Sequence, residues 1–216
     1  DLTGETRNPA KEGLSDQTRS IFAGGYSMPG QSRVNGAEFI TIASTGNGVD
    51  FGDTTEASVW TYGGSSPTRG IYAGGSTPSR TNSMCFITIS TQGDAADFGD
   101  LTLARSNGAS SMTNAVRMVM AGGYYDSSPN FTNTIDFVTI ATLGDAQDFG
   151  DTSATNSGQA SGSSKTRGVH YTGGNTTGNT LEYIQIMTTG NAVDFGDLNS
   201  ARRVYGTCSN GHGGLG

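Results

Sequence analysis

Alternating apolar and polar positions in short runs indicate a chain built of β-strands. The clearest runs place an aromatic residue, an aliphatic, a polar residue and a second aliphatic in succession. They span residues 39–42, 86–89, 137–140 and 183–186. A period of two is typical of a strand with one buried face. Every window of a dozen residues contains Gly, Pro or a Ser/Thr cluster, which disfavours long amphipathic helices. We therefore expect an all-β fold.

Repeated motifs predict how these strands are grouped. The tetrad Asp-Phe-Gly-Asp begins at residues 50, 97, 148 and 194, with spacings of 47, 51 and 46. A small residue followed by Gly-Gly falls at 23–25, 73–75, 121–123 and 172–174. A unit of roughly 48 residues has the length of one four-stranded propeller blade. In the second unit we expect strands at 59–65, 69–75, 85–90 and 97–101, and in the whole chain a four-bladed β-propeller.

The two ends of the repeat region complement each other. Residues 18–25 have the pattern of a second strand without a first strand before it, and residues 203–209 have that of a first strand without a second after it. We expect the C-terminal strand to pair with the N-terminal blade and close the ring, which removes exposed strand edges. The expected organisation is an N-terminal arm or linker at 1–17, the propeller at 18–211 and a Gly-rich tail at 212–216.

The order of motifs resembles a known family. Arg, an apolar pair, Gly-Gly, a variable loop, an alternating strand and an aromatic resemble kelch-type repeats, with Phe at the tetrad where kelch repeats usually carry Trp. The phrase Ile-Ala-Ser-Thr-Gly-Asn-Gly-Val-Asp-Phe-Gly-Asp at 42–53, together with Pro-Thr-Arg-Gly-Ile-Tyr-Ala-Gly-Gly at 67–75, resembles repeats of virion structural and tail-fibre-like proteins of marine bacteriophages, cyanophages especially. The resemblance covers about residues 19–208.

This resemblance implies a non-enzymatic structural protein of the virion, an extracellular particle. We expect a tail- or fibre-associated propeller that attaches to a host surface glycan or receptor, or to other virion proteins, within a homo-oligomeric or larger assembly. The alternatives are a purely structural decoration of capsid or tail, and a kelch-like enzyme acting on polysaccharide. Propellers host many functions, so the repeat itself does not choose among these.

Composition narrows the classes of partner. Gly accounts for 34 of 216 residues, and 12 basic against 19 acidic residues give a net charge of −7. Binding to a phosphate backbone needs clustered Lys and Arg, so we expect no nucleic-acid partner. No apolar run approaches 18 residues, so we expect no membrane insertion. Cys85 and Cys208 are expected to be small buried apolar residues, with a disulfide between them as the alternative.

The tetrads hold eight of the nineteen acidic residues, which makes their paired carboxylates candidates for a calcium site or for acid–base catalysis. The competing interpretation is structural: Asp caps a tight turn, Gly takes a backbone conformation that other residues avoid, and Phe packs between blades. All four units carry the motif, and one tetrad cannot supply the six to eight oxygens that calcium takes. We expect the structural role.

Arginine recurs before the second strand of each unit, at positions 19, 69, 117 and 167. These side chains are expected to donate hydrogen bonds to carbonyls of the neighbouring blade or to a tetrad Asp, with a groove for an anionic ligand as the alternative. His170 and His212 are 42 positions apart and have no ligand partner at metal spacing. With no nucleophile elbow either, we expect no enzymatic activity, no cofactor and no metal site.

The connection between the second and third strands varies in length from unit to unit, whereas the segment from the third strand to the tetrad does not. The strand-three aromatic lies 11 positions before each tetrad, whereas 14, 11, 14 and 9 positions separate the second Gly of each pair from that aromatic. The variable loops carry our candidate binding residues, which are Tyr26, Met28, Arg33, Arg80, Tyr124, Tyr125, Asp126, Phe131, Asn175 and Asn179. In a propeller they share one face, where aromatic and amide groups can stack on sugars or contact a protein. The alternative is a set of solvated connections with one or two aromatics folded back.

Overall fold

The computed structural model describes residues 6–7, 14–107, 110–126, 130–155, 157, 160–172 and 178–201. Within these ranges the chain forms four antiparallel sheets of four strands, which we number in chain order. Sheet one consists of β2 (Leu14–Ser15), β3 (Arg19–Ala23), β5 (Gly36–Thr41) and β6 (Val49–Asp53). Sheet two consists of β7 (Tyr62–Ser65), β8 (Arg69–Ala73), β9 (Ser83–Thr88) and β10 (Ala96–Asp100).

Sheets three and four repeat the same order. Sheet three consists of β12 (Ser110–Thr113), β13 (Arg117–Ala121), β15 (Thr134–Thr139) and β16 (Gln147–Asp151). Sheet four consists of β17 (Ser161–Ser163), β18 (Arg167–Tyr171), β19 (Thr180–Gln185) and β20 (Val193–Asp197). Two short pairs accompany them, β1 (Thr6–Arg7) with β4 (Tyr26–Ser27) and β11 (Arg105–Ser106) with β14 (Tyr124–Tyr125). In the described ranges no helix is long and apolar enough to cross a bilayer.

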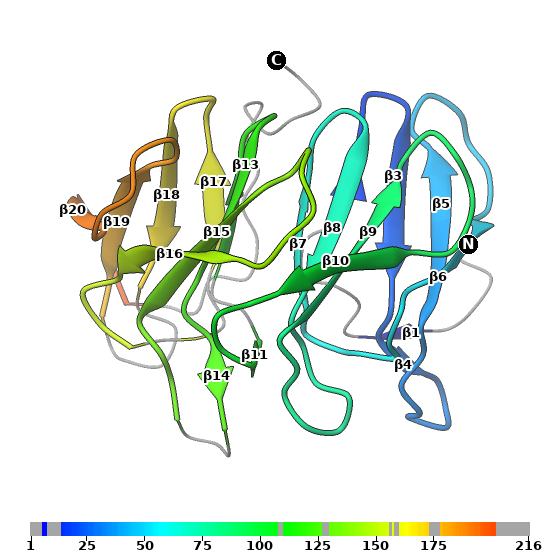
Figure 1. The fold of residues 1–216 in the computed structure, drawn as a ribbon, viewed down its shortest axis with the longest axis horizontal. Coiled ribbons are helices and arrows are strands. Elements are labelled where there is room, and N and C mark those ends of the chain that lie inside the picture. Colours follow the sequence, from blue (N-terminus) through cyan, green and yellow to red (C-terminus); the bar gives the residue numbers. More distant parts are fainter. Residues whose placement is uncertain are drawn as a thin grey trace.

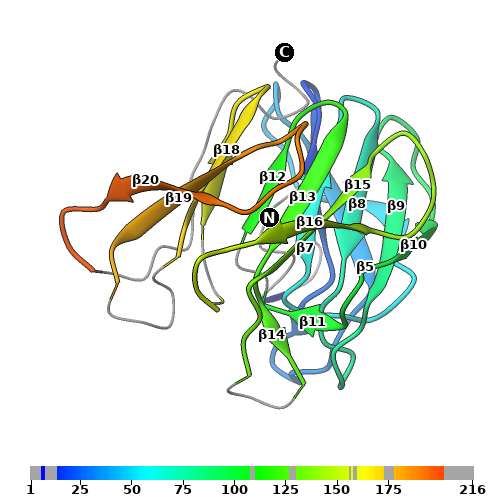
Figure 2. The same ribbon diagram turned by 60° about the vertical axis from the view of Figure 1, so that its left-hand side comes forward.

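The four sheets follow one another in space as they do along the chain. Figure 1 shows sheet one at the right and sheet four at the left, and Figure 2 shows β19 and β20 at one outer end. Consecutive sheets contact through their first strands, β2 with β7, β7 with β12 and β12 with β17. Small residues allow this approach, since a Cβ on Gly64 would lie 2.5 Å from Cγ2 of Thr113. The all-β prediction and the grouping into four-stranded units are confirmed.

The core lies between the sheets as three clusters of buried apolar residues. Each cluster combines the tetrad Phe of one sheet with one aliphatic residue in the third strand of the next sheet and another directly after that strand. Phe51 packs with Ile87 and Ile89, Phe98 with Val138 and Ile140, and Phe149 with Ile184 and Ile186. Each of these Phe rings is 2% exposed. The prediction that the tetrad Phe packs between units is therefore confirmed at the three boundaries between sheets.

The tetrads lie in the fourth strands, as expected for the strand at 97–101, and not in tight turns. The predicted cap from the Asp side chain is present at the fourth tetrad, where the Gly196 N–H donates to Oδ1 of Asp194 at 3.2 Å. In β10 the pairing with β9 shifts register between Asp97 and Gly99, which makes Phe98 the extra residue of a β-bulge. Gly99 has a φ of +136°, a conformation that side chains disfavour. The bulge explains why Phe and Gly occur together: it turns the ring toward the next sheet and needs glycine after it.

The first strand of sheet one also differs from our prediction. Leu14 pairs with Ile21 and Ser15 with Ser20, so β3 has β2 on one side and β5 on the other. The expectation that residues 18–25 lack a first strand is wrong, because Leu14 and Ser15, part of the expected arm, fill that position. Leu14 is fully buried, and removing its side chain from water stabilises the packing of this two-residue strand. Residues 203–209 lie outside the described residues, and closure of a ring is not shown.

Candidate binding face

The connections between second and third strands emerge at one end of the sheets, where Figure 1 places β4 and β14 along the lower edge. We call this end the loop face. Because consecutive strands of a sheet are antiparallel, the connection between its second and third strands lies at the end opposite its other two connections. Two clusters of aromatic and arginine side chains lie there.

The first cluster joins sheets one and two. The rings of Tyr26 and Trp60 meet edge to face, with centroids 6.1 Å apart, and the Arg33 guanidinium lies 5.5 Å from the Tyr26 centroid. Nε of Arg33 donates to the carbonyl oxygen of Ser76 at 3.1 Å. All three cluster side chains are half-buried. The first loop is thereby held against sheet two rather than extending freely into solvent.

The second cluster joins sheets two and three. The rings of Tyr124 and Phe131 lie 4.5 Å apart in a tilted arrangement, and the two residues form a β-bridge. The Arg80 guanidinium lies 5.9 Å from the Tyr124 centroid. These three side chains are also half-buried, with part of each surface open to solvent. The loop face therefore presents two aromatic and guanidinium clusters, each bridging a boundary between sheets.

The other predicted loop residues are distributed less evenly. Met28 is 38% exposed beside the first cluster. Tyr125 lies in β14 beside Tyr124 and is half-buried, and Asp126 is exposed with a φ of +53°. Asn175 lies outside the described residues. These positions add an apolar, an aromatic and an acidic group to the loop face.

Asn179 belongs to the scaffold instead of a variable loop. Its backbone oxygen accepts from the Leu198 N–H, and its Nδ2 donates to the Leu198 carbonyl at 2.8 Å. The backbone oxygen at the matching place in each other sheet makes the same bond to the residue after the tetrad; these residues are Asn35, Asn82 and Asn133. An Asn 15 positions before every tetrad is a repeat signal in the sequence that loop-length comparison overlooks.

Trp60 is the functional candidate that the sequence analysis did not select. It is the only Trp of the chain and has a φ of +59°, which is rare for a bulky residue. Its carbonyl oxygen accepts from the N–H of Asn107, which occupies the same place in the next repeat and has a φ of +51°. The unusual backbone thus recurs at two sheet boundaries and sets the Trp60 ring on the loop face. Its uniqueness was the available sequence signal.

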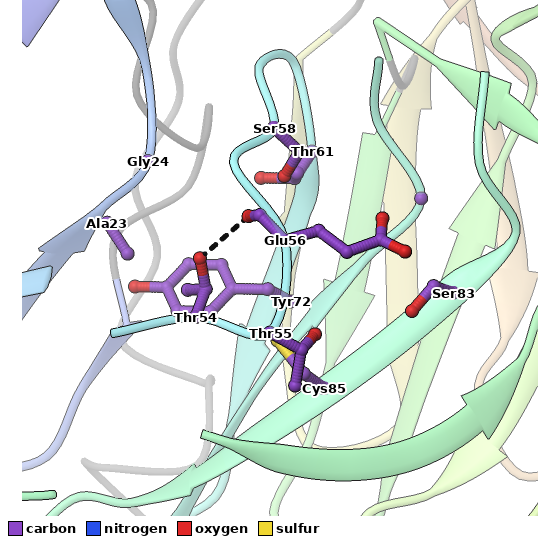
Figure 3. A pocket seen from close by; sticks show the side chains of 11 residues that line it. Ala23, Gly24, Thr54, Thr55, Glu56, Ser58, Thr61, Tyr72, Ser83 and Cys85 are labelled. Carbon is purple, nitrogen blue, oxygen red and sulfur yellow. Dashed lines mark hydrogen bonds between the residues drawn. The ribbon is translucent and has the colours of Figure 1, made fainter. Parts of the chain in front are cut away.

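A small pocket lies between sheets one and two, and Figure 3 shows its lining, which includes Tyr72, Cys85, Thr55 and Thr61. Its volume of about 20 Å³ is enough for one water molecule and too small for a substrate. The Tyr72 hydroxyl is buried with no hydrogen-bond partner among the described residues. Burial raises the pKa of the Cys85 thiol above its usual value, which keeps it protonated and unreactive. This pocket does not have the properties of a catalytic site.

The repeated arginines are structural at three positions. Nη1 of Arg19, Arg69 and Arg117 donates to the carbonyl oxygens of Ile89, Ile140 and Ile186 at 3.0, 2.9 and 3.1 Å. Each guanidinium also stacks on the strand-three aromatic of its own sheet. The prediction of hydrogen bonds to the neighbouring unit is confirmed for these three. Arg167 stacks on Tyr183 at 4.5 Å and is exposed.

Two buried polar pairs lie in the interior, one joining β11 to sheet three and one inside sheet four. Arg105 and Asp136 form an ion pair of 3.1 Å, with neither side chain exposed. His170 Nε2 lies 3.6 Å from Glu182, and burial lowers the pKa of His170 to about 4. His170 is thus neutral near pH 7. Across the part of the chain that is described, no three His, Cys, Asp or Glu side chains gather as metal ligands would.

Comparison with known proteins adds no family assignment: no protein-family model matches the chain, and no curated protein matches it either. The loop face and the packing of the sheets are therefore the basis for functional inference.

Proposed function

We propose that this chain is a non-enzymatic structural protein of a virus particle, associated with a tail or fibre, whose loop face attaches to a glycan on the host surface. The observation that carries the proposal is the pair of aromatic and guanidinium clusters around Tyr26 and Tyr124. The resemblance of the repeats to those of marine bacteriophage structural proteins supports the virion assignment.

The chemistry of the clusters suits a shallow sugar site. A half-exposed aromatic ring offers a flat apolar surface for the C–H face of a sugar ring, and a neighbouring guanidinium donates several hydrogen bonds in fixed directions. Asp126, exposed near the second cluster, adds an acceptor for sugar hydroxyls. The contacts of Arg33 and Arg80 with rings and backbone hold these groups in place before binding, which lowers the entropic cost.

The same proposal includes the fold at finer detail: the four sheets are blades of a kelch-like β-propeller. The contact of first strands and the Phe-filled boundaries between sheets support it. A propeller gathers the loops of all its blades on one face, so weak contacts from separate loops add up on one ligand.

The experiment is a glycan array with the purified chain and with Tyr26→Ala and Tyr124→Ala. Val116→Ala is the control, since Val116 lies in the turn before β13, at the opposite end of sheet three, and is 48% exposed. We expect both Tyr variants to lose tenfold or more in affinity, with melting temperatures within a few degrees of the parent. Unchanged binding by both would refute a role of the loop face.

A second candidate is attachment to a neighbouring virion protein. Met28, 38% exposed beside the first cluster, favours it because an adaptable apolar side chain suits a protein interface. A chain that binds no glycan, but whose cross-links to another virion protein fall on residues 26–33 and 124–131, would support this candidate over the first.

A further inference from the structure

The three boundaries between sheets share one pattern of contacts, which we call the junction. The tetrad strand of one sheet receives a Gly-Asx turn from the next sheet. At the first junction the N–H groups of Gly93 and Ala95 donate to the carbonyl oxygens of Phe51 and Asp53, both at 2.7 Å. In return, the Asp53 N–H donates to Oδ1 of Asp94 at 2.9 Å. The tetrad strand is thus extended by a short piece of pairing with its neighbour.

The other two junctions repeat these three bonds. Gly144 and Ala146 donate to Phe98 and Asp100 at 2.9 and 2.8 Å, and Asp100 donates to Asp145 at 3.0 Å. Gly190 and Ala192 donate to Phe149 and Asp151 at 2.7 and 2.9 Å, and Asp151 donates to Asn191 at 3.0 Å. Either Asp or Asn serves in the turn, because only its side-chain oxygen is used.

Sheet four presents one uncovered half of this junction. Phe195 is 51% exposed, whereas the other three tetrad Phe rings are 2% exposed. A Cβ on Gly196 would meet nothing within 4 Å, whereas a Cβ on Gly52, Gly99 or Gly150 would lie 2.5 Å from the backbone of the turn that covers it. The exposed Arg167 is the fourth of the arginines that elsewhere reach the neighbouring sheet. Figure 2 shows β20 at the outer end of the array.

Sheet one presents the other half. Ile42 is 54% exposed, whereas Ile89, Ile140 and Ile186 at the same place in the other sheets are at most 1% exposed. The carbonyl oxygens of those three residues accept from the repeated arginines. Four residues after Ile42 comes the turn Gly46-Asn47-Gly48, which matches Gly93-Asp94-Ala95 in sequence and place. The first sheet therefore has the groups that an uncovered tetrad strand binds.

We propose that the open face of sheet four binds sheet one of a second copy of this chain. Phe195 of one copy packs on Ile42 of the other, the 46–48 turn pairs with β20, and Arg167 donates to the Ile42 carbonyl. The contact continues the interface that already joins consecutive sheets inside one chain, and this is the reason to name a second copy as the occupant. Two copies joined twice in this way complete a ring of eight sheets, within the range known for propellers.

The first test is the mass in solution by light scattering, over a range of concentrations. We expect twice the 22.2 kDa of one chain for the parent protein, and one chain for Phe195→Asp and for Ile42→Asp. Because the contact is head to tail, each variant keeps one intact face, so an equimolar mixture of the two should form a pair. Val116→Asp, an apolar residue of similar exposure that lies on neither end face, should leave the mass of the parent unchanged.

The second test identifies the occupant. Asp197 and Asn47 match Asp53 and Asp94, which are joined through backbone and side chain. The double variant Asp197→Cys with Asn47→Cys should therefore oxidise to a covalent dimer on non-reducing gels. A monomer with a rapid-migrating internal disulfide would show instead that the chain closes on itself. A parent that is monomeric at all concentrations, or a mixture of the Asp variants that stays monomeric, would also overturn the proposal.

Discussion

Arg105 and Asp136 form an ion pair 3.1 Å long in which both side chains are fully buried. Nη2 of Arg105 also donates to the Met120 carbonyl, and Asp136 accepts from the N–H and the hydroxyl of Thr102. The pair therefore connects the end of sheet two with two strands of sheet three. A buried charge is tolerated here because its partner lies within hydrogen-bond distance.

Removing one member of this pair should be costlier than removing both. We expect Arg105→Leu to lower the free energy of unfolding by about 3–5 kcal/mol, because the Asp136 carboxylate stays buried without its counter-charge. Arg105→Leu combined with Asp136→Leu should recover much of that loss. Urea unfolding of the two single variants and the double variant measures the coupling. Additive losses would show that the two charges stabilise the fold independently.

The tetrads offer a matched pair of Phe residues. Phe98→Ala should cost about 3 kcal/mol, as large-to-small changes in a core do, since its ring is 2% exposed between sheets two and three. Phe195→Ala alters the same motif at a ring that is 51% exposed, and should cost less than about 1 kcal/mol. Chemical denaturation at a concentration where the chain is monomeric compares the two. Equal losses would contradict the packing described for Phe98.

Substitutions at two glycines of the tetrad motif distinguish the cost of backbone strain from the cost of a steric clash. Gly99 and Gly196 have φ values of +136° and +132°, so an added side chain strains both backbones alike. Only at Gly99 would the new Cβ lie 2.5 Å from the backbone of Gly144. We expect Gly99→Ala to destabilise the chain by about 1–3 kcal/mol more than Gly196→Ala, the range for overpacking. Thermal unfolding followed by circular dichroism provides this comparison.

His170 should make the fold sensitive to mild acid. Burial lowers its pKa to about 4 from 6.5, so the unfolded chain binds a proton more readily than the folded one. The stability this gives is present above pH 6.5 and is lost as the pH falls toward 4, by about 3 kcal/mol in all. His170→Gln removes the titration. The difference in unfolding free energy between parent and variant should therefore fall between pH 6.5 and 4, and a constant difference would contradict a neutral buried His170.

The repeat pattern predicted the turns, strands and four-stranded units, because these depend on residues that are close together in the chain. Turn residues and alternating strands recur at nearly constant spacing, and four antiparallel strands per unit follow from local chemistry. The packing of Phe51, Phe98 and Phe149 and the hydrogen bonds of Arg19, Arg69 and Arg117 were also predictable. A ring or a guanidinium that recurs in every unit is best placed where units meet. The sequence placed the second tetrad in the fourth strand of its unit and also predicted a tight turn capped by Asp, because Asp and Gly favour turns. Pairing with the third strand made this segment a bulged strand, which the local pattern did not predict.

Tertiary contacts decided the rest, because burial is a property of what lies opposite a residue. Phe98 and Phe195 stand in identical tetrads, yet one is buried and the other half exposed, since among the described residues only Phe98 has a further sheet packed against it. Leu14 and Ser15 became a strand because Leu14 fits beside Gly70 of the next sheet, which no local pattern encodes. The charged Arg105 is buried because Asp136, 31 positions away in the chain, lies opposite it. Trp60 reached the loop face through a backbone conformation that its residue type disfavours, held by a hydrogen bond from the next repeat.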